Sequence, residues 1–375
     1  MMMTVPMSSL SCVGSMVFNP SRLELALARR RFTARVLAEM ADITVVSLSR
    51  IFNGNQVPEP TTVARIAAAL DYPTTFFYDG EVDTLPAESV SFRSLSSMTK
   101  REANAAIAAG SLAYMVSDWL DARYELPLPK LIDCSQERDP AGAARALRQA
   151  WALGEKPIGN LIKLLEAKGI RVFSLAENTK NVDAFSCWRN EQPFIFLNTF
   201  KSTERSRFDA AHELGHLILH KHGGSNQGRQ AEAEANSFAS SFLMPRADVL
   251  AEMPRIHALR QIVVRKGRWG VSVAALTYRL HKLGLISDWQ YRTFNIEIRS
   301  TFGNVEPDSM PRETSSLWRM VLNDMWQQRK TRNHIAAELN IPHAELENLL
   351  FGLTNGTEAE GVSPAKGRPS LALVD

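Results

Sequence analysis

One stretch of this chain of 375 residues restricts its fold more than any other: RFDAAHELGHLILH, at residues 207–220. It places His212 and His216 four residues apart. In a helix, this spacing turns the two imidazoles about 40° apart on one face, so both can bind a single cation. The fold must therefore hold this helix beside a metal and bring further ligands to it from other elements.

Glu213 follows His212 directly in this pattern. Catalysis at a zinc centre needs a carboxylate that accepts a proton from water yet occupies no coordination position, and Glu213 is placed to do this. The His-Glu-x-x-His pattern therefore predicts a catalytic zinc site with Glu213 as the general base.

A third ligand has to come from outside this helix, because a catalytic zinc usually has three protein ligands and one open position. The next predicted helix offers Glu232 and Glu234, which lie about 200° apart around its axis and cannot both face the metal. We favour Glu232, because Asn236 shares its face and can hydrogen-bond a ligand. His220 continues the four-residue spacing of His212 and His216 and is a candidate fourth ligand. His222 is expected to be exposed in a loop.

Length and composition indicate an ordinary globular protein. The chain is long enough for two or three compact units, and its apolar fraction of 45% and charged fraction of 22% allow packed cores. A net charge of +3 is too small to mark the whole chain as a nucleic-acid coat, so DNA contacts would need a local patch. No signal peptide, membrane-length apolar run or disulfide spacing is evident, which predicts a cytoplasmic protein. The three cysteines are far apart: Cys12, Cys134 and Cys187.

The spacing of apolar residues, glycines and prolines predicts a mostly helical α+β fold. Helical spacing occurs at residues 98–124, 143–168, 204–220, 230–242, 271–286 and 334–350, and β-branched or aromatic runs predict strands at 171–175, 183–188 and 193–198. The predicted domains are an N-terminal helix-turn-helix bundle at 18–78, a helical linker region at 79–140, a metallopeptidase domain with a small sheet at 141–255, a helical C-terminal domain at 256–353 and a disordered tail at 354–375.

The N-terminal bundle contains a helix-turn-helix pattern. Leu37 and Ala38 are apolar on its first helix, and Leu48 and Ile51 are apolar on its second. Five residues form the outward face of the second helix, where bases would be read: Thr44, Val45, Val46, Ser49 and Arg50. The same bundle has a positively charged flank that suits phosphates, with Glu24 as the single acid among its arginines. These arginines are Arg22, Arg29, Arg30, Arg31 and Arg35. Of these, Arg30 and Arg35 are the candidate DNA contacts.

The alternative is a helical bundle used for protein contacts. Residues 331–350 carry a weaker helix-turn-helix-like pattern that packing explains equally well.

Two resemblances agree with these patterns. The segments DAFSCW, PFIFLNTFKSTERSRFDAAHELGHLILH and EAEANSFASSFLMP together resemble the ImmA/IrrE family of metallopeptidases, over about residues 150–250. The resemblance implies a zincin-like fold, zinc held by His212, His216 and Glu232, and Glu213 as the base. It also implies a regulatory endopeptidase that cleaves a partner repressor or antitoxin-like regulator.

The first domain resembles a helix-turn-helix of the XRE type. The family's glutamine is replaced here by Ala34, which removes a common DNA contact and is expected to reduce affinity. Its turn glycine is replaced by Asp42, and aspartate tolerates the left-handed conformation that such a turn needs.

The function expected is therefore that of a zinc-dependent regulatory endopeptidase. Its expected partners are a protein substrate and double-stranded DNA, with a homodimer as an option and no membrane. The alternatives are a non-enzymatic, zinc-containing transcriptional regulator and a component of a phage-immunity or toxin–antitoxin module. Glu213 favours the enzyme, because a purely structural zinc site has no use for a non-ligating carboxylate beside the metal.

Overall fold

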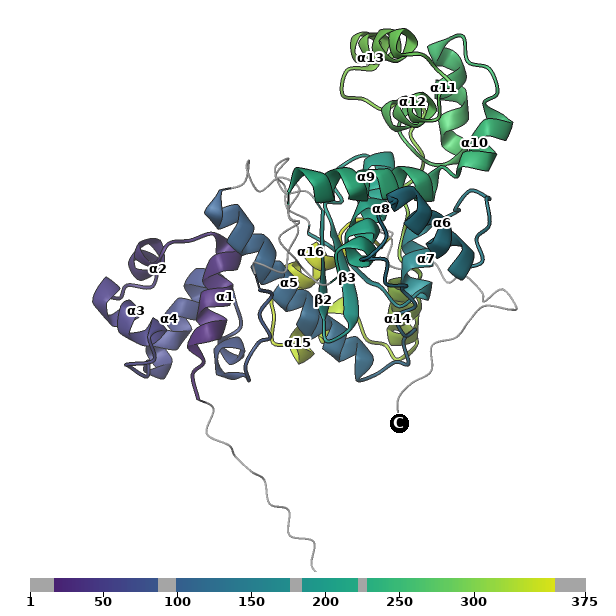
Figure 1. The fold of residues 1–375 in the computed structure, drawn as a ribbon. Coiled ribbons are helices and arrows are strands. Elements are labelled where there is room, and N and C mark those ends of the chain that lie inside the picture. The colour runs from purple at the N-terminus through teal and green to yellow at the C-terminus, as the bar shows by residue number, and fades with distance from the viewer. Residues whose placement is uncertain (1–16, 87–98, 176–183, 222–227, 355–375) are drawn as a thin grey trace, which may run out of the picture. The chain divides into compact units, whose positions relative to one another are not determined.

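The computed structural model describes residues 17–86, 99–175, 184–221 and 228–354 (Figure 1). The chain divides into two compact units, residues 1–82 and residues 83–375. Among the described residues, no helix is both long and apolar enough to span a bilayer. Residues 355–375 of the predicted tail and His222 lie outside the described residues.

The first unit is a small helical bundle. Its helices are α1 (Pro20–Arg30), α2 (Ala34–Met40), α3 (Val45–Phe52) and α4 (Pro60–Leu70), followed by the 3-10 turn η1 (Thr74–Tyr78). Three of the helices begin at a residue whose side chain accepts a backbone N–H, and these residues are Asn19, Thr33 and Thr44. The predicted apolar positions Leu37, Ala38, Leu48 and Ile51 are buried, which confirms the helix-turn-helix core.

The turn between α2 and α3 depends on Asp42. This residue has φ 50°, in the left-handed region that aspartate adopts more readily than most residues. Arg65 of α4 donates to the Asp42 carbonyl oxygen over 2.7 Å and holds the turn against the bundle. The expectation that aspartate can replace the turn glycine is confirmed.

The second unit combines a three-stranded sheet with helices. Its strands are β1 (Arg171–Ser174), β2 (Phe185–Arg189) and β3 (Gln192–Leu197). Its helices are α5 (Lys100–Asp121), α6 (Pro140–Ala150), α7 (Leu161–Ala167), α8 (Thr203–Leu219), α9 (Arg229–Leu243), α10 (Arg246–Glu252), α11 (Leu259–Arg265), the 3-10 turn η3 (Lys266–Arg268), α12 (Val273–Lys282), α13 (Asp288–Phe302), α14 (Ser316–Gln327), α15 (Arg332–Glu338) and α16 (His343–Leu350). The predicted mostly helical α+β class is confirmed.

The sheet has the order β1-β3-β2, with β3 parallel to β1 and antiparallel to β2. Asn190 and Glu191 both have positive φ and form the tight turn of the β2–β3 hairpin. Side chains alternate along β3: Ile195 and Leu197 belong to the apolar core that includes α8, whereas Phe194 makes an edge-to-face contact with Tyr114 of α5. The sheet therefore lies between α8 on one face and α5 on the other.

One stretch of predicted helical spacing is divided in the structure. Residues 143–168 form α6 and α7, separated by a loop that contains Gly154, Pro157 and Gly159, because Gly154 adopts φ 56° and proline disfavours helix interiors. The helical spacing at residues 334–350 belongs to two short helices, α15 and α16, in line with the helix-turn-helix-like pattern at residues 331–350. Both helices bury apolar residues within the second unit, and α16 contacts β1 and α5, so packing accounts for this pattern.

Candidate metal centre

Helix α8 carries the two histidines at the centre of the second unit. Ser202 begins the helix by accepting the N–H of Arg205, and apolar residues such as Leu214 and Ile218 pack it into the core. His212 and His216 are buried at 1% and 7% exposure. The core therefore fixes both imidazoles before any ligand binds.

His212, His216 and Glu232 come together as a candidate metal site. The Nε2 atoms of His212 and His216 lie 3.0 Å apart, and the Glu232 carboxylate oxygens lie 3.4 Å from the first and 3.5 Å from the second. Among the described residues, this is the one group of three or more metal-binding side chains whose ligand atoms all lie within 4.8 Å of one another. Burial would raise the pKa of Glu232, but its hydrogen bonds to His212 and His216 outweigh burial and hold that pKa well below its usual range.

The three side chains fit zinc. Two nitrogens and one oxygen form a common catalytic zinc ligand set, and ligands at about 2.0–2.2 Å in a tetrahedron lie about 3.3 Å from one another. The observed separations of 3.0, 3.4 and 3.5 Å need shifts of only a few tenths of an ångström.

A close approach of α9 to α8 brings Glu232 to the histidines. Gly215 lies between the two histidines, and a Cβ at this position would lie 3.0 Å from Phe238 Cδ1 and 3.3 Å from Ala235 Cα. A side chain there would push α9 away, so glycine allows the helix contact that completes the ligand set.

Two polar side chains, one half-buried and one buried, lie beside this candidate site. Asn236 Oδ1 lies 3.1 Å from Nδ1 of His212, on the side of the ring away from the ligand cluster. Ser186 of β2 donates from its hydroxyl to Glu213 Oε2 over 2.8 Å, and Glu213 is 1% exposed. Asn236 was among the expected residues, whereas Ser186 was missed. The alternation of β2 carried the signal, because Ser186 and Trp188 share the face that contacts α8.

The alternative ligands lie elsewhere. His220 Nδ1 is 3.1 Å from Nδ1 of His216, and its Nε2 is 3.0 Å from Glu234 Oε2. Neither His220 nor Glu234 belongs to the candidate cluster. Glu234 instead hydrogen-bonds with His220 and Gln230.

The first unit presents the predicted DNA-reading face to solvent. Thr44 begins α3 by accepting the N–H of Ser47, and Val45 and Val46 are exposed at 51% and 62%. Ser49 and Arg50 are also exposed, and the Arg50 guanidinium makes no hydrogen bond or ion pair to any residue in the described part of the chain.

The predicted arginine flank is largely engaged within the unit. Arg22 is buried, donates to the Gly80 carbonyl and pairs with Asp79, so it does not lie on a phosphate-binding surface. Arg30 donates to the Leu70 and Asp71 carbonyl oxygens at the end of α4. Arg35 is exposed and pairs with Glu39 of the same helix.

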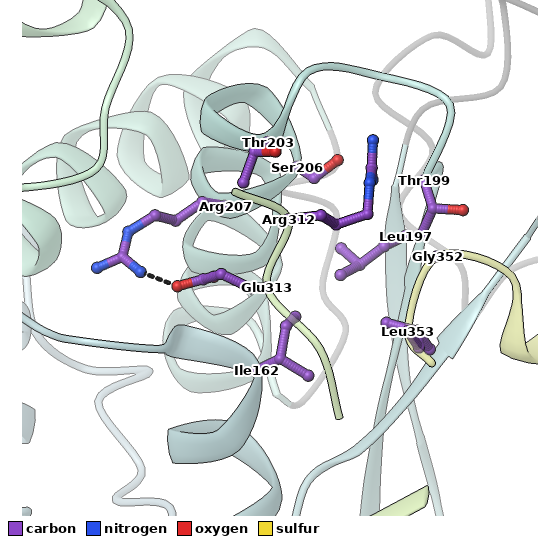
Figure 2. A pocket seen from close by; sticks show the side chains of 10 residues that line it. All are labelled: Ile162, Leu197, Thr199, Thr203, Ser206, Arg207, Arg312, Glu313, Gly352 and Leu353. Carbon is purple, nitrogen blue, oxygen red and sulfur yellow. Dashed lines mark hydrogen bonds and ion pairs between the residues drawn. The ribbon is translucent and has the colours of Figure 1, made fainter. Parts of the chain in front are cut away.

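A small pocket lies at the N-terminal end of α8, and Figure 2 shows its lining. Arg207 and Glu313 form an ion pair at its wall, and Thr203 and Ser206 line it from the first turns of the helix. None of the candidate metal ligands lines this pocket. The Arg207–Glu313 pair anchors α8 to the C-terminal part of the unit.

The geometry places a candidate metal site in one unit and a helix-turn-helix in the other. Residues 165–281 match the peptidase family described as the IrrE N-terminal-like domain, and residues 23–77 match the helix-turn-helix family. The chain therefore carries a DNA-binding type of domain followed by an ImmA/IrrE-type peptidase domain, and both predicted resemblances are confirmed. The peptidase match includes the sheet, both histidines and Glu232. No curated protein matches the sequence.

Proposed function

We propose that this protein is a zinc-dependent endopeptidase with a regulatory role, which cleaves a repressor or antitoxin-like regulator and is directed to DNA by its first unit. One observation carries the proposal. Two buried histidines and Glu232 converge on one point, while the adjacent Glu213 stays outside the ligand set. This division of roles suits catalysis better than a purely structural site.

His212, His216 and Glu232 would hold the zinc ion. When bound, zinc supplies Lewis-acid stabilisation of a carbonyl oxygen and makes water more acidic. Both ring nitrogens of His220 face other side chains, so three protein ligands are available in the described residues and a coordination position stays open. An open position is typical of catalytic zinc sites.

Glu213 would move the protons of peptide hydrolysis. Its carboxylate accepts a proton from the attacking water as the water oxygen bonds to the scissile carbonyl carbon. It then passes that proton to the amide nitrogen as the C–N bond breaks. The hydroxyl of Ser186 holds one carboxylate oxygen and so fixes the direction in which Glu213 acts.

The exposed face of α3 supports the DNA-binding role of the first unit. A helix with Thr44, Ser49 and Arg50 on its outer surface can offer hydroxyl and guanidinium donors to base edges in a major groove. Val45 and Val46 can contact thymine methyl groups.

The burial of Glu213 favours a second candidate, a transcriptional regulator in which zinc only stabilises the fold, because a closed site restricts access of a peptide. Co-expression of wild type or Glu213→Gln with repressors encoded beside the gene separates the two. We expect wild type to remove the full-length repressor and the variant to co-purify with it uncleaved. Equal regulation by both proteins without any cleavage favours the stabilised regulator.

A further inference from the structure

Each candidate histidine ligand has a partner for its outer ring nitrogen. His212 directs Nδ1 to the side-chain oxygen of Asn236, a single neutral acceptor. His216 directs Nδ1 to His220, which in turn directs Nε2 to the Glu234 carboxylate at 3.0 Å. The two ligands are thus supported unequally, one by an amide and the other by a chain that ends in a carboxylate.

This inference rests on the proposed function. If His216 binds a metal ion, the chemistry of binding determines which atom donates and which accepts in each hydrogen bond from His216 to Glu234. Nε2 of His216 faces the ligand cluster, so it must be unprotonated to bind a cation and the ring proton must lie on Nδ1. That proton can be donated only if Nδ1 of His220 accepts it, which leaves the His220 proton on Nε2. Glu234 Oε2 then accepts from His220.

We propose that His220 and Glu234 are positioning residues for the metal centre, which hold His216 in the tautomer and ring orientation that bind zinc. Carboxylate–histidine contacts of this kind orient a ligand and raise its basicity. Here an additional imidazole lies between the carboxylate and the ligand. Because Glu234 and His220 act through one chain of hydrogen bonds, their effects on metal binding should not add.

The hydrogen-bonded side chains of His220 and Glu234 are largely buried. The side chains of His220 and Glu234 are 19% and 30% exposed, and the ring of His216 packs against that of His220 with centroids 5.1 Å apart. Gln230 also donates to Glu234 Oε1 over 2.9 Å, so both carboxylate oxygens are engaged by neighbours. The carboxylate is therefore fixed in place to accept from His220.

The test is the zinc dissociation constant of the purified full-length protein, measured by competition with a chromophoric chelator. Loss of such an outer partner typically weakens metal binding about 10- to 100-fold. We expect this loss for His220→Ala, about 10-fold for Glu234→Ala, and no further loss in the double variant. Glu234→Gln keeps an acceptor oxygen and should restore most of the affinity. The matched control is His257→Ala, since His257 is exposed and far along the chain from the cluster.

Thermal unfolding of the metal-free proteins separates positioning from folding, because a merely structural role would lower the unfolding temperature and affect Glu234→Gln and Glu234→Ala alike. Wild-type affinity in both alanine variants, or additive losses in the double variant, would overturn the proposal. If His220→Ala does not fold, the comparison of Glu234→Ala with Glu234→Gln decides the matter. Failure of wild type itself to bind zinc would instead refute the proposed function.

Discussion

At the scale of single residues, the candidate site separates ligands from the groups that orient them. Glu232 and Glu234 are two positions apart on α9, yet one lies against both ligand histidines and the other against His220. We predict that Glu232→Ala loses stoichiometric zinc, whereas Glu234→Ala keeps it with reduced affinity, because only Glu232 supplies a ligand atom. Metal analysis after dialysis measures this, and full zinc in the Glu232 variant would contradict the ligand assignment.

Ser186 gives a second prediction at this scale. Its hydroxyl donates to Glu213 over 2.8 Å, so Ser186→Ala should leave zinc bound but misdirect the base. Loss of one hydrogen bond of about 1–1.5 kcal/mol corresponds to a roughly 5- to 10-fold lower kcat. The matched control is Ser240→Ala, since the buried Ser240 hydroxyl has no hydrogen-bond partner among the described residues. An unchanged kcat in the Ser186 variant would show that this hydroxyl does not orient Glu213.

At the scale of elements, the site depends on how closely α8 and α9 pack. A Cβ at Gly215 would lie 3.0 Å from Phe238 Cδ1, so Gly215→Ala should separate the helices. Overpacking of this kind costs about 1–3 kcal/mol, and we expect both a lower free energy of unfolding in urea and weaker zinc binding. Gly267→Ala is the control, because its Cβ would meet nothing within 4 Å. Equal stability of the two variants would show that α9 is not held by this contact.

The opposite end of α8 is anchored by charge. Arg207 forms a buried ion pair with Glu313 (Figure 2). Its guanidinium also donates to the carbonyl oxygens of Ile158 and Trp269. Arg207→Ala should destabilise the unit by about 3–5 kcal/mol, because it leaves a buried carboxylate without its partner. The double variant Arg207→Met, Glu313→Leu should be less destabilised than Arg207→Ala, and the reverse order in urea unfolding would argue against an unpaired charge as the cause.

Helices were predicted from the sequence more accurately than the contacts between them, because local signals determine where a helix forms. The four-residue spacing of His212 and His216 predicted a helix that the structure contains. The contact of His220 with Glu234 could not be predicted, because it joins two helices whose relative rotation depends on packing around Gly215 and Phe238. The break between α6 and α7 was missed because the apolar spacing continues on both sides of it.

At the scale of the whole molecule, each of the two units has its own function to test. The first unit presents Arg50 on the outer face of α3 and Arg35 on α2. We predict that the full-length chain binds duplex DNA with an affinity that falls as salt rises, because arginines release counterions from phosphates. Arg50→Ala should relax sequence preference, whereas Arg35→Ala should weaken binding to all sequences alike. Gel shifts at several salt concentrations measure both, and no binding at low salt would leave the unit as a protein-contact module.

We propose that the second unit hydrolyses peptide bonds with Glu213 as the base, and the rate of cleavage tests this role. Purified wild type and Glu213→Gln, brought to equal zinc content, should be compared in the initial rate of cleavage of a repressor encoded beside the gene. Glutamine keeps the shape of the side chain but cannot carry the proton, so the rate should fall about 10²- to 10⁴-fold with zinc and fold unchanged. Cleavage at the same rate by both proteins would contradict the account.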